Sequence, residues 1–299
     1  MKRFDFSNVD IQEELAPIEG TEFVTWADVS KAVRHRRANP IKTIKTPFQK
    51  MAGEFEYSVG GYHLIGGYSG HGKSTYALQC LLYAAQDHKV AIASLEMTPD
   101  SIGELTYSLA SGVQRCDEIY EEKIDAWLED RVMFYDRIDS IAPDEAIQAI
   151  IHAAKCGCTL ILLDCLFMIE GVCQDPEKEA AFTKTLAVVG KKFNVAILLV
   201  HHMRKPAGDE SHVPSKSGFI GSSHMVNASL SCSILWRDFE VIEARQRGIG
   251  NVDESVPDVK LKIDKNRFFP SHATYALYEH KSRALCESSV RRVKRLVES

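Results

Sequence analysis

Short, unbroken apolar runs alternate along this chain with longer segments whose apolar residues recur every three or four positions. Runs of this kind are typical of strands buried on both faces of a parallel sheet. The sequence predicts such strands at 62–66, 90–95, 132–135, 160–164, 195–200 and 232–236.

The segments between these runs predict helices. Leu78, Leu81 and Leu82 give an apolar face to a helix over 75–86, and Thr98 followed by Pro99 is typical of a helix start. Further helices are predicted at 24–38, 116–130, from Pro143 and from Asp175-Pro176. Because strands and helices alternate, we expect an α/β fold with a mostly parallel twisted sheet flanked by helices.

The loop between the first of these strands and its helix carries a phosphate-binding motif. Its sequence, Gly67-Tyr68-Ser69-Gly70-His71-Gly72-Lys73-Ser74, fits G-x-x-x-x-G-K-[ST]. Glycines there let backbone N–H groups wrap a triphosphate at a helix N-terminus. A chance glycine-rich turn is the alternative, and the flanking strand and helix argue against it. We expect ATP or another nucleoside triphosphate to be bound by Gly67, Ser69, Gly70, His71, Gly72, Lys73, Ser74 and Thr75.

Polar residues end two further strands. The run 160–164 ends in Asp164, the Walker B pattern, in which a carboxylate beside the phosphate loop helps to hold Mg²⁺ together with Ser74. The run 195–200 is followed by His201-His202. A histidine there can sense the γ-phosphate, although a hydrogen-bonded pair of partly exposed histidines is an equal alternative. Together these residues indicate a RecA-like P-loop NTPase core.

Composition agrees with a globular nucleotide-binding protein. The chain has 299 residues, of which 45% are hydrophobic, and a formal net charge of −5. Two stretches are locally basic, at 31–50 and from Lys281 onward. Each of them is explained as well by a solvated helix face as by contact with DNA.

No window of about 18 apolar residues predicts a membrane span, and the N-terminus lacks the apolar core of a signal peptide. The eight cysteines are scattered, and Cys156-Gly157-Cys158 is too closely spaced for an ordinary zinc knuckle. We therefore expect free thiols, no structural metal and a cytoplasmic location.

One segment resembles a known family. Ala93-Ser94-Leu95-Glu96-Met97, followed by a helix that ends in Leu109-Ala110-Ser111-Gly112, looks like the segment after the P-loop in DnaB-type replicative helicases. That family of hexameric helicases includes phage primase–helicases and mitochondrial Twinkle. The resemblance runs from about Thr46 to Glu279 and is strongest at the P-loop, at this segment and between Asp164 and His202.

The resemblance implies roles for individual residues. Glu96 corresponds to the general base that polarises the attacking water, Lys73 to the phosphate ligand, Asp164 to the Walker B acid and His202 to the γ-phosphate sensor. The loop Met203–Ser217 corresponds to one that grips single-stranded DNA, and residues 171–178 form a second candidate loop. In the first loop the expected DNA contacts are Arg204, Lys205, Lys216 and Ser217.

Two later segments also match the family. Arg237 corresponds to an arginine that stacks on the nucleotide base. Lys265-Asn266-Arg267-Phe268 resembles the K-x-R segment, in which Arg267 would be an arginine finger for the neighbouring subunit and Lys265 would lie beside it. The sequence departs from the family at Ile220, where an arginine is usual, and at Ser223, where a glycine is usual.

The resemblance implies a three-part organisation: an arm and linker helix at 1–50, a RecA-like ATPase domain at 51–280 and a basic tail at 281–299. From this resemblance we expect an ATP-dependent helicase or translocase that acts on single-stranded DNA as a homo-hexamer or similar ring. Its possible partner is a primase or other replisome protein, in a bacterial or phage-infected cell. The alternatives are a non-unwinding DNA-binding ATPase, such as a loader, recombination mediator or scaffold, and a P-loop ATPase unrelated to DNA.

Overall fold

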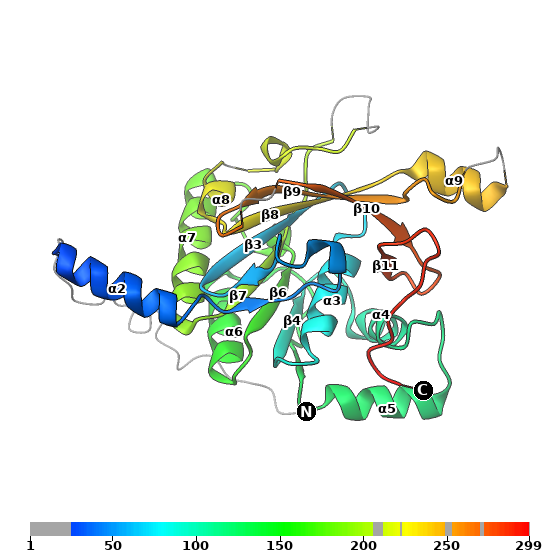
Figure 1. Ribbon diagram of the computed structural model, residues 1–299, viewed down its shortest axis with the longest axis horizontal. Helices are drawn as coiled ribbons and strands as arrows, with labels where there is room; N and C mark the ends of the chain where they lie inside the picture. The colour runs from blue at the N-terminus through cyan, green and yellow to red at the C-terminus, as the bar shows by residue number, and fades with distance from the viewer. Residues whose placement is uncertain (1–24, 206–211, 222, 249–252, 270–271, 299) are drawn as a thin grey trace.

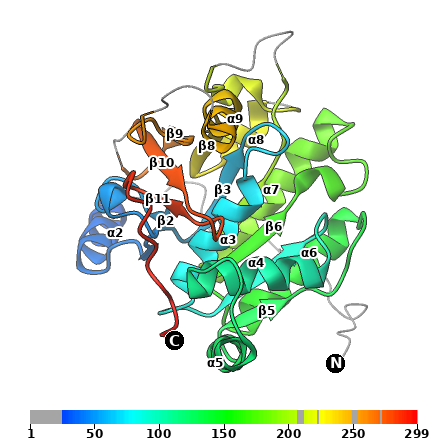
Figure 2. The same cartoon turned by 90° about the vertical axis from the view of Figure 1, so that its right-hand side faces the viewer.

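The chain forms an α/β domain around one large sheet. The computed structural model describes residues 25–205, 212–221, 223–248, 253–269 and 272–298, so residues 1–24 of the arm and linker expected at 1–50 lie outside the described residues. Within them, the main sheet has the strand order β11-β10-β9-β8-β3-β7-β6-β4-β5. Figures 1 and 2 show it at the centre of the molecule with helices on both sides. The expected fold class is confirmed.

Parallel and antiparallel strands occupy different parts of this sheet. Neighbours from β8 to β5 are parallel, whereas β9, β10 and β11 are antiparallel. Every predicted strand is present, and β9 to β11 were not predicted. The bounds are β3 (Gly61–Gly66), β4 (Val90–Ser94), β5 (Val132–Phe134), β6 (Leu160–Asp164), β7 (Ala196–Val200), β8 (Ser231–Arg237), β9 (Val259–Asn266), β10 (Thr274–Glu279) and β11 (Leu285–Cys286), with β1 (Thr43–Ile44) and β2 (Tyr57–Ser58) forming a separate pair.

The helices that start at Pro99, Pro143 and Pro176 begin where the sequence places their starts. The P-loop helix begins at Lys73, two residues before its predicted start, and the helices at 223–228 and 239–247 were not predicted. Asp175 accepts hydrogen bonds from the backbone N–H groups of Glu177 and Lys178, and Thr98 is the N-cap residue before Pro99. Within the described residues, no helix has both the length and the apolar composition to cross a membrane. The bounds are α2 (Trp26–Ala38), α3 (Lys73–Ala84), α4 (Pro99–Ser111), α5 (Glu118–Leu128), α6 (Pro143–Lys155), α7 (Pro176–Phe193), α8 (Ser223–Ala228) and α9 (Phe239–Arg247), with short 3₁₀ turns η1 (Gln49–Met51), η2 (Leu166–Met168) and η3 (Lys216–Gly218).

Two hydrophobic layers cover the sheet, one on each face. On β6, Leu160 and Leu162 pack with α3 and α4, whereas Ile161 and Leu163 pack with α6 and α7. Successive side chains of a strand point to opposite faces, so an unbroken apolar run supplies both layers. Covering both faces leaves the ends of the strands as the accessible part of the sheet, which is where polar groups can meet a ligand.

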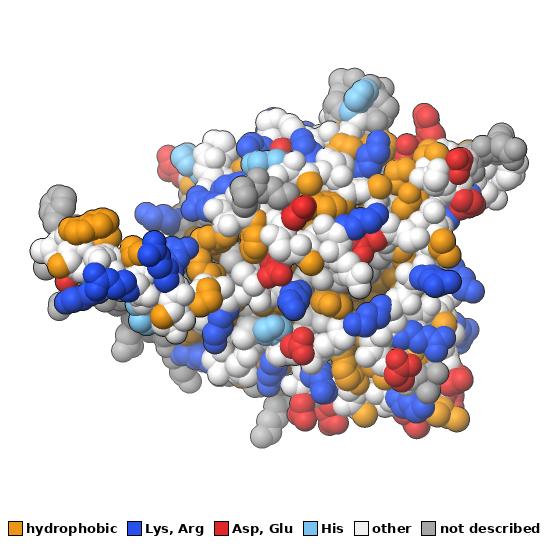
Figure 3. Space-filling model, viewed as in Figure 1, with side chains coloured by type: hydrophobic (Ala, Val, Ile, Leu, Met, Phe, Trp, Pro, Cys, Tyr) orange, Lys and Arg blue, Asp and Glu red, His pale blue; other side chains and the backbone are white. Residues whose placement is uncertain are grey.

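Helix α2 extends away from this core (Figure 1). Its start is fixed by a capping box between Thr25 and Asp28, and every one of its residues, all of them described, is at least partly exposed. Trp26 is 78% exposed. Figure 3 shows Lys and Arg side chains gathered on this helix. The guanidinium of Arg36 lies over the ring of Phe268, 5.9 Å from its centroid, which places the base of α2 beside the end of β9.

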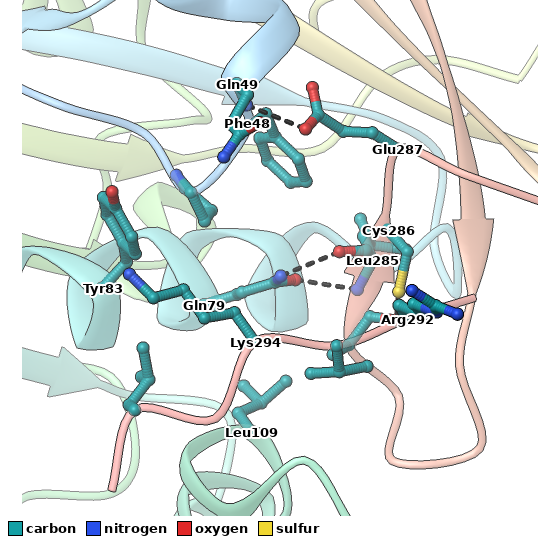
Figure 4. A pocket seen from close by; sticks show the side chains of 14 residues that line it. Phe48, Gln49, Gln79, Tyr83, Leu109, Leu285, Cys286, Glu287, Arg292 and Lys294 are labelled. Atoms are coloured by element: carbon teal, nitrogen blue, oxygen red, sulfur yellow. Dashed lines mark hydrogen bonds between the residues drawn. The ribbon is translucent and has the colours of Figure 1, made fainter. Parts of the chain in front are cut away.

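The segment expected as a basic tail packs against the domain. Leu285 and Cys286 add strand β11 to the sheet, and Gln79 of α3 exchanges two hydrogen bonds with the backbone of Leu285. Val293 and Leu296 pack against the hydrophobic layer of α3 and α4. A cavity of about 600 Å³ lies between this segment, α3 and the connector that follows α2 (Figure 4). Residues 281–298 are therefore packed as part of the domain that contains the main sheet.

A close backbone approach between a helix and the sheet leads to a stability prediction. A Cβ atom added at Gly190 in α7 would lie 2.6 Å from the Cα of Gly61 in β3. Because both partners are backbone, the helix itself must move to admit a methyl group. We expect Gly190→Ala to lower the free energy of unfolding by about 1–3 kcal/mol, measured by urea denaturation.

Gly103→Ala is the matched control, because Gly103 also lies inside a helix and a Cβ there meets nothing within 4 Å. We expect this change to raise stability by up to about 1 kcal/mol, through helix propensity alone. Equal effects of the two substitutions would contradict the packing argument.

Candidate active site

Five neighbouring parallel strands end at one edge of the sheet, and each end carries residues singled out in the sequence. β3 leads into the P-loop, β4 leads to Glu96, β6 ends at Asp164, β7 leads to His202 and β8 ends at Arg237. These strands are adjacent in the order β8-β3-β7-β6-β4. Their carboxyl ends therefore form a single row, the usual position of a ligand in an open α/β sheet.

The P-loop has the backbone of a phosphate cradle. Gly72 is the N-cap residue of α3 in the left-handed conformation, with φ of 83°. A Cβ at Gly72 would lie 2.9 Å from the guanidinium of Arg237, and one at Gly67 would lie 2.6 Å from the carbonyl oxygen of Leu235. Glycine is thus required at both positions. The N-terminus of the twelve-residue helix α3 faces this loop and favours an anion there.

A chain of hydrogen bonds joins the lysine of the loop to the carboxylate after β4. Lys73 Nζ donates to the carbonyl of Tyr68 at 3.0 Å and to Nδ1 of His202 at 3.3 Å. An ammonium group can only donate, so the ring proton of His202 lies on Nε2. Nε2 then donates to Oε1 of Glu96 at 3.2 Å. Residues from the ends of β3, β7 and β4 thereby form one polar unit.

Glu96 is set up as a hydrogen-bond acceptor. Its Oε1 also accepts a hydrogen bond from the thiol of Cys165, at a Sγ–Oε1 distance of 3.0 Å. The hydrogen bond from His202 lowers the pKa of Glu96 to about 2, and Cys165 and the charge of Lys73 act in the same direction. The carboxylate is therefore ionised at neutral pH, the state needed to orient a water molecule.

Asp164 has the opposite environment. It is 2% exposed, and burial raises its pKa to about 6 against the opposing effect of the Ser74 hydroxyl. Its Oδ1 is buried and has no hydrogen-bond partner among the described residues. An unpartnered carboxylate oxygen beside a hydroxyl fits the all-oxygen coordination that Mg²⁺ prefers. Ser74 and Asp164 are therefore the residues that would hold the magnesium ion of a bound nucleotide.

Arg237 packs against the P-loop, where its guanidinium lies close to Gly72. That guanidinium pairs with Glu279 of β10 at 2.9 Å, and the backbone N–H of Arg237 donates to Nδ1 of His71 at 2.9 Å. The His71 ring packs edge-on against Tyr68 and Phe239. The imidazole of His71 thus supports the shape of the loop, and the phosphate contact expected of His71 is left to its backbone.

Lys265 and Arg267 lie at the other edge of the sheet. β9 runs antiparallel to β8, so its last residue, Asn266, pairs with the first residue of β8. Lys265 Nζ donates to three carbonyls at the end of α8, and Arg267 donates to the carbonyl of Asn227. The start of β8 is about 10 Å along the strand from the level of Gly66, where the P-loop begins. Arg267 is therefore outside the P-loop site of its own chain.

The loop after β7 is tied at its base to the two histidines. Ile220 N–H donates to the carbonyl of His202 at 3.3 Å, and His201 Nε2 donates to the carbonyl of Ile220 at 2.8 Å. Arg204 and Lys205 follow this base at the N-terminal end of the loop. Lys216 and Ser217 lie at its C-terminal end, where the backbone N–H of Lys216 donates to Asp264 at 2.6 Å. Residues 206–211 of the expected DNA-binding loop lie outside the described residues.

Three residues of this site were not identified from the sequence. Cys165 was expected only as one of the free thiols, yet its Sγ contacts Glu96. Phe167 is 48% exposed, and its ring lies edge-on to His202 at 6.1 Å. Glu279 pairs with Arg237 from a strand that was not predicted. The position of Cys165 directly after Asp164 was the one available signal, because it must lie at the same strand end.

Comparisons with known proteins agree with this geometry. The profile of the AAA domain family matches residues 57–208. The ATPase domain of G40P has a TM-score of 0.71 at 13% identity, covering 90% of this chain and 100% of that one. A DnaB-like replicative helicase, described with its interactions with primase, has a TM-score of 0.70 at 14% identity, covering 87% of this chain and 67% of that one. At these identities the likeness shows a shared fold. No curated protein matches the sequence.

The buried carboxyl of Asp164 predicts an opposition between stability and binding. The pKa of Asp164 is raised from 3.8 to about 6. Its ionisation therefore lowers the free energy of unfolding as pH rises through this interval. We expect Asp164→Asn to stabilise the metal-free protein at pH 7 by about 1–3 kcal/mol, at 1.36 kcal/mol per pKa unit less the hydrogen bonding an amide needs. Urea unfolding in the presence of a chelator measures this.

The gain from Asp164→Asn should be small at pH 4, grow between pH 4 and 6, and stay level above that interval. The exposed residue Asp144 in the first turn of α6 provides the control, and Asp144→Asn should show no such profile. A difference in unfolding free energy between wild type and Asp164→Asn that did not change with pH would contradict the assigned environment.

Proposed function

Because this chain belongs to the AAA domain family, we propose that it is an ATP-driven motor of the DnaB-like replicative helicase type, acting on single-stranded DNA as a ring-shaped oligomer. The observation that carries the proposal is the continuous path from the P-loop to the loop after β7. Lys73 contacts His202, and the backbone of His202 holds the base of that loop. A change at the phosphate site therefore has a direct mechanical route to the candidate DNA contacts.

In this proposal the residues at the strand ends divide the work of hydrolysis. Lys73 and the backbone of the P-loop bind the phosphates, and the ionised Glu96 orients the attacking water. Ser74 and Asp164 hold Mg²⁺, which neutralises charge on the phosphate oxygens when it is bound. When Lys73 turns to a nucleotide, His202 loses the donor to Nδ1, so its orientation reports whether the phosphate site is filled.

The position of Arg267 supports a shared active site. Arg267 lies at the edge of the sheet opposite its own P-loop and is exposed. An arginine finger at that position can reach only the nucleotide of a neighbouring subunit, so we infer that subunits associate head to tail. Such heterologous contacts close into rings when the rotation between subunits permits. Arg237, packed against the P-loop, is the candidate for contact with the base of the nucleotide in its own subunit.

Contact with DNA is proposed for the loop Met203–Ser217. Arg204, Lys205, Lys216 and Ser217 offer cations and a hydroxyl at its two ends, which suits phosphate contacts without base reading. One of the similar structures is described with primase, and we propose a primase or another replisome protein as a partner of this chain in the cytoplasm.

A second candidate function is an ATPase that binds DNA without unwinding it. The observation favouring it is Ile220, an apolar residue at the base of the candidate DNA loop, where the helicase family usually has an arginine. In that case ATP would control assembly on DNA rather than strand separation.

Hydrolysis and unwinding together separate these candidates. We expect single-stranded DNA to stimulate ATP hydrolysis and the protein to separate a forked duplex, measured by phosphate release and by strand displacement. Stimulation without displacement would favour the second candidate, and no response to DNA would contradict both.

The loop contacts can be tested in the same assay. We expect the double substitution Arg204→Ala with Lys205→Ala to weaken DNA binding. The negative slope of the logarithm of the association constant against the logarithm of the salt concentration should become shallower by about 1.4, at about 0.7 for each phosphate contact on a single strand. Lys184→Ala with Lys191→Ala, two exposed lysines of α7, is the charge-matched control and should leave the slope unchanged.

A mixing experiment tests the shared site. We expect Arg267→Ala and Glu96→Gln proteins each to lose hydrolysis, and a 1:1 mixture to recover up to about a quarter of the wild-type rate, because random assembly in a ring pairs the two intact halves at that fraction of interfaces. Glu96→Gln mixed with Lys73→Met is the control, since both defects lie on the same side of the interface. Recovery in the control, or none in the first mixture, would contradict a finger acting in trans.

A further inference from the structure

Three potential metal ligands converge beside the magnesium position. Glu96 Oε1 lies 3.0 Å from Cys165 Sγ and 3.2 Å from His202 Nε2, and all three ligand atoms lie within 4.8 Å of one another. They come from the ends of the adjacent strands β4, β6 and β7. Within the described residues this is the one group of three such ligands.

The donor set differs in kind from that of the magnesium position. Asp164 and Ser74 offer oxygen, which suits a hard cation such as Mg²⁺, whereas a thiolate and an imidazole select a softer ion. Ligand atoms bound at about 2.0–2.3 Å to a tetrahedral Zn²⁺ lie about 3.3–3.6 Å apart. The two separations from Glu96 Oε1, 3.0 and 3.2 Å, lie within a few tenths of an ångström of this range, and the separation between Cys165 Sγ and His202 Nε2 is at most 4.8 Å. Three protein ligands leave the fourth position open to water.

We propose that Glu96, Cys165 and His202 form a site for a thiophilic divalent cation, Zn²⁺ or Cd²⁺, whose binding switches off ATP hydrolysis. The ion binds the carboxylate of Glu96, the group that would orient water, and takes the imidazole nitrogen with which His202 holds Glu96. The inhibitory effect rests on the proposed ATPase function, whereas the binding itself does not. The side chain of Glu96 is 36% exposed, so the site opens to solvent.

Binding requires two protons to move. The Cys165 thiol gives up its proton to solvent when the metal–sulfur bond forms. His202 must bind through Nε2, so its ring proton passes to Nδ1, which now faces the ammonium of Lys73 at 3.3 Å. Two donors cannot share this contact, so Lys73 must withdraw. Removing the Lys73 ammonium should therefore not weaken metal binding, although the same change disables the phosphate site.

The test is binding of Cd²⁺ by nucleotide-free protein in excess Mg²⁺, measured by equilibrium dialysis and by cadmium–thiolate absorbance. We expect one site in the wild-type protein. Cys165→Ser should weaken binding by more than about 100-fold, since loss of even an outer partner of a ligand costs about 10–100-fold. His202→Gln should also weaken it, and Lys73→Met should bind at least as tightly as wild type.

Cys156→Ser is the matched control. Cys156 Sγ lies 3.6 Å from His152 Nε2 and is the competing cysteine–histidine pair, but it lacks a third ligand among the described residues. This variant should bind Cd²⁺ at the site as the wild type does. Unchanged binding by folded Cys165→Ser and His202→Gln proteins, or loss of the site in Cys156→Ser, would overturn the proposal.

The activity arm uses saturating Mg²⁺ and ATP with free Zn²⁺ set by a metal buffer, and each variant is compared with its own metal-free rate. Wild type and Cys156→Ser should be inhibited at the same free Zn²⁺, and Cys165→Ser should need a concentration more than about 100-fold higher. Cysteine-dependent metal binding without any ATPase in the metal-free protein would refute the proposed function and leave the metal site standing. Hydrolysis that continues with the site filled would refute the inhibitory role.

Discussion

A buried ammonium group needs hydrogen-bond acceptors, and this requirement organises the site around Lys73. The lysine is 6% exposed, and burial lowers its pKa. Its burial is tolerated because a carbonyl of the P-loop and a nitrogen of His202 accept hydrogen bonds from the ammonium group. The hydrogen bond from Lys73 to Nδ1 of His202 fixes the tautomer of the histidine. The Nε2 proton of that tautomer is donated to Glu96 in a hydrogen bond, which lowers the pKa of Glu96 and keeps it ionised. One desolvated charge thus aligns groups from three separate strands before any ligand arrives.

The same edge of the sheet holds a carboxyl group that folding alone does not favour. Asp164 is enclosed with one oxygen unsatisfied among the described residues, while Glu96 nearby keeps its charge through two donors. Two carboxylates a short distance apart therefore have pKa values pushed in opposite directions, a pattern typical of sites that divide two chemical tasks. This local cost is offset by the hydrophobic layers above and below the sheet.

The parallel part of the fold was predictable because strands buried on both faces must be apolar throughout, as in Leu160–Leu163. The antiparallel part was missed because β9 alternates, with Val259, Leu261 and Ile263 buried between partly exposed residues. That alternation was present in the sequence, but strands were predicted only at unbroken apolar runs. The contact of Cys165 with Glu96 was not predictable, since it depends on the register that pairs Ser94 with Asp164. No spacing within the chain specifies such a pairing between strands.

The reversal of direction at β9 has a consequence for symmetry. By carrying the end of that strand back along the sheet, it places Arg267 at the opposite end of the parallel strands from the P-loop, about 10 Å along the strand direction. A subunit built this way has two unlike poles, and a head-to-tail contact pairs one pole with the other, whereas a two-fold contact uses the same patch on both subunits. In the head-to-tail association proposed above, each added subunit would expose a new unpaired pole. Growth along such a polar axis would end only when the last subunit meets the first, so the geometry of closure, rather than the strength of any one contact, would set the number of subunits.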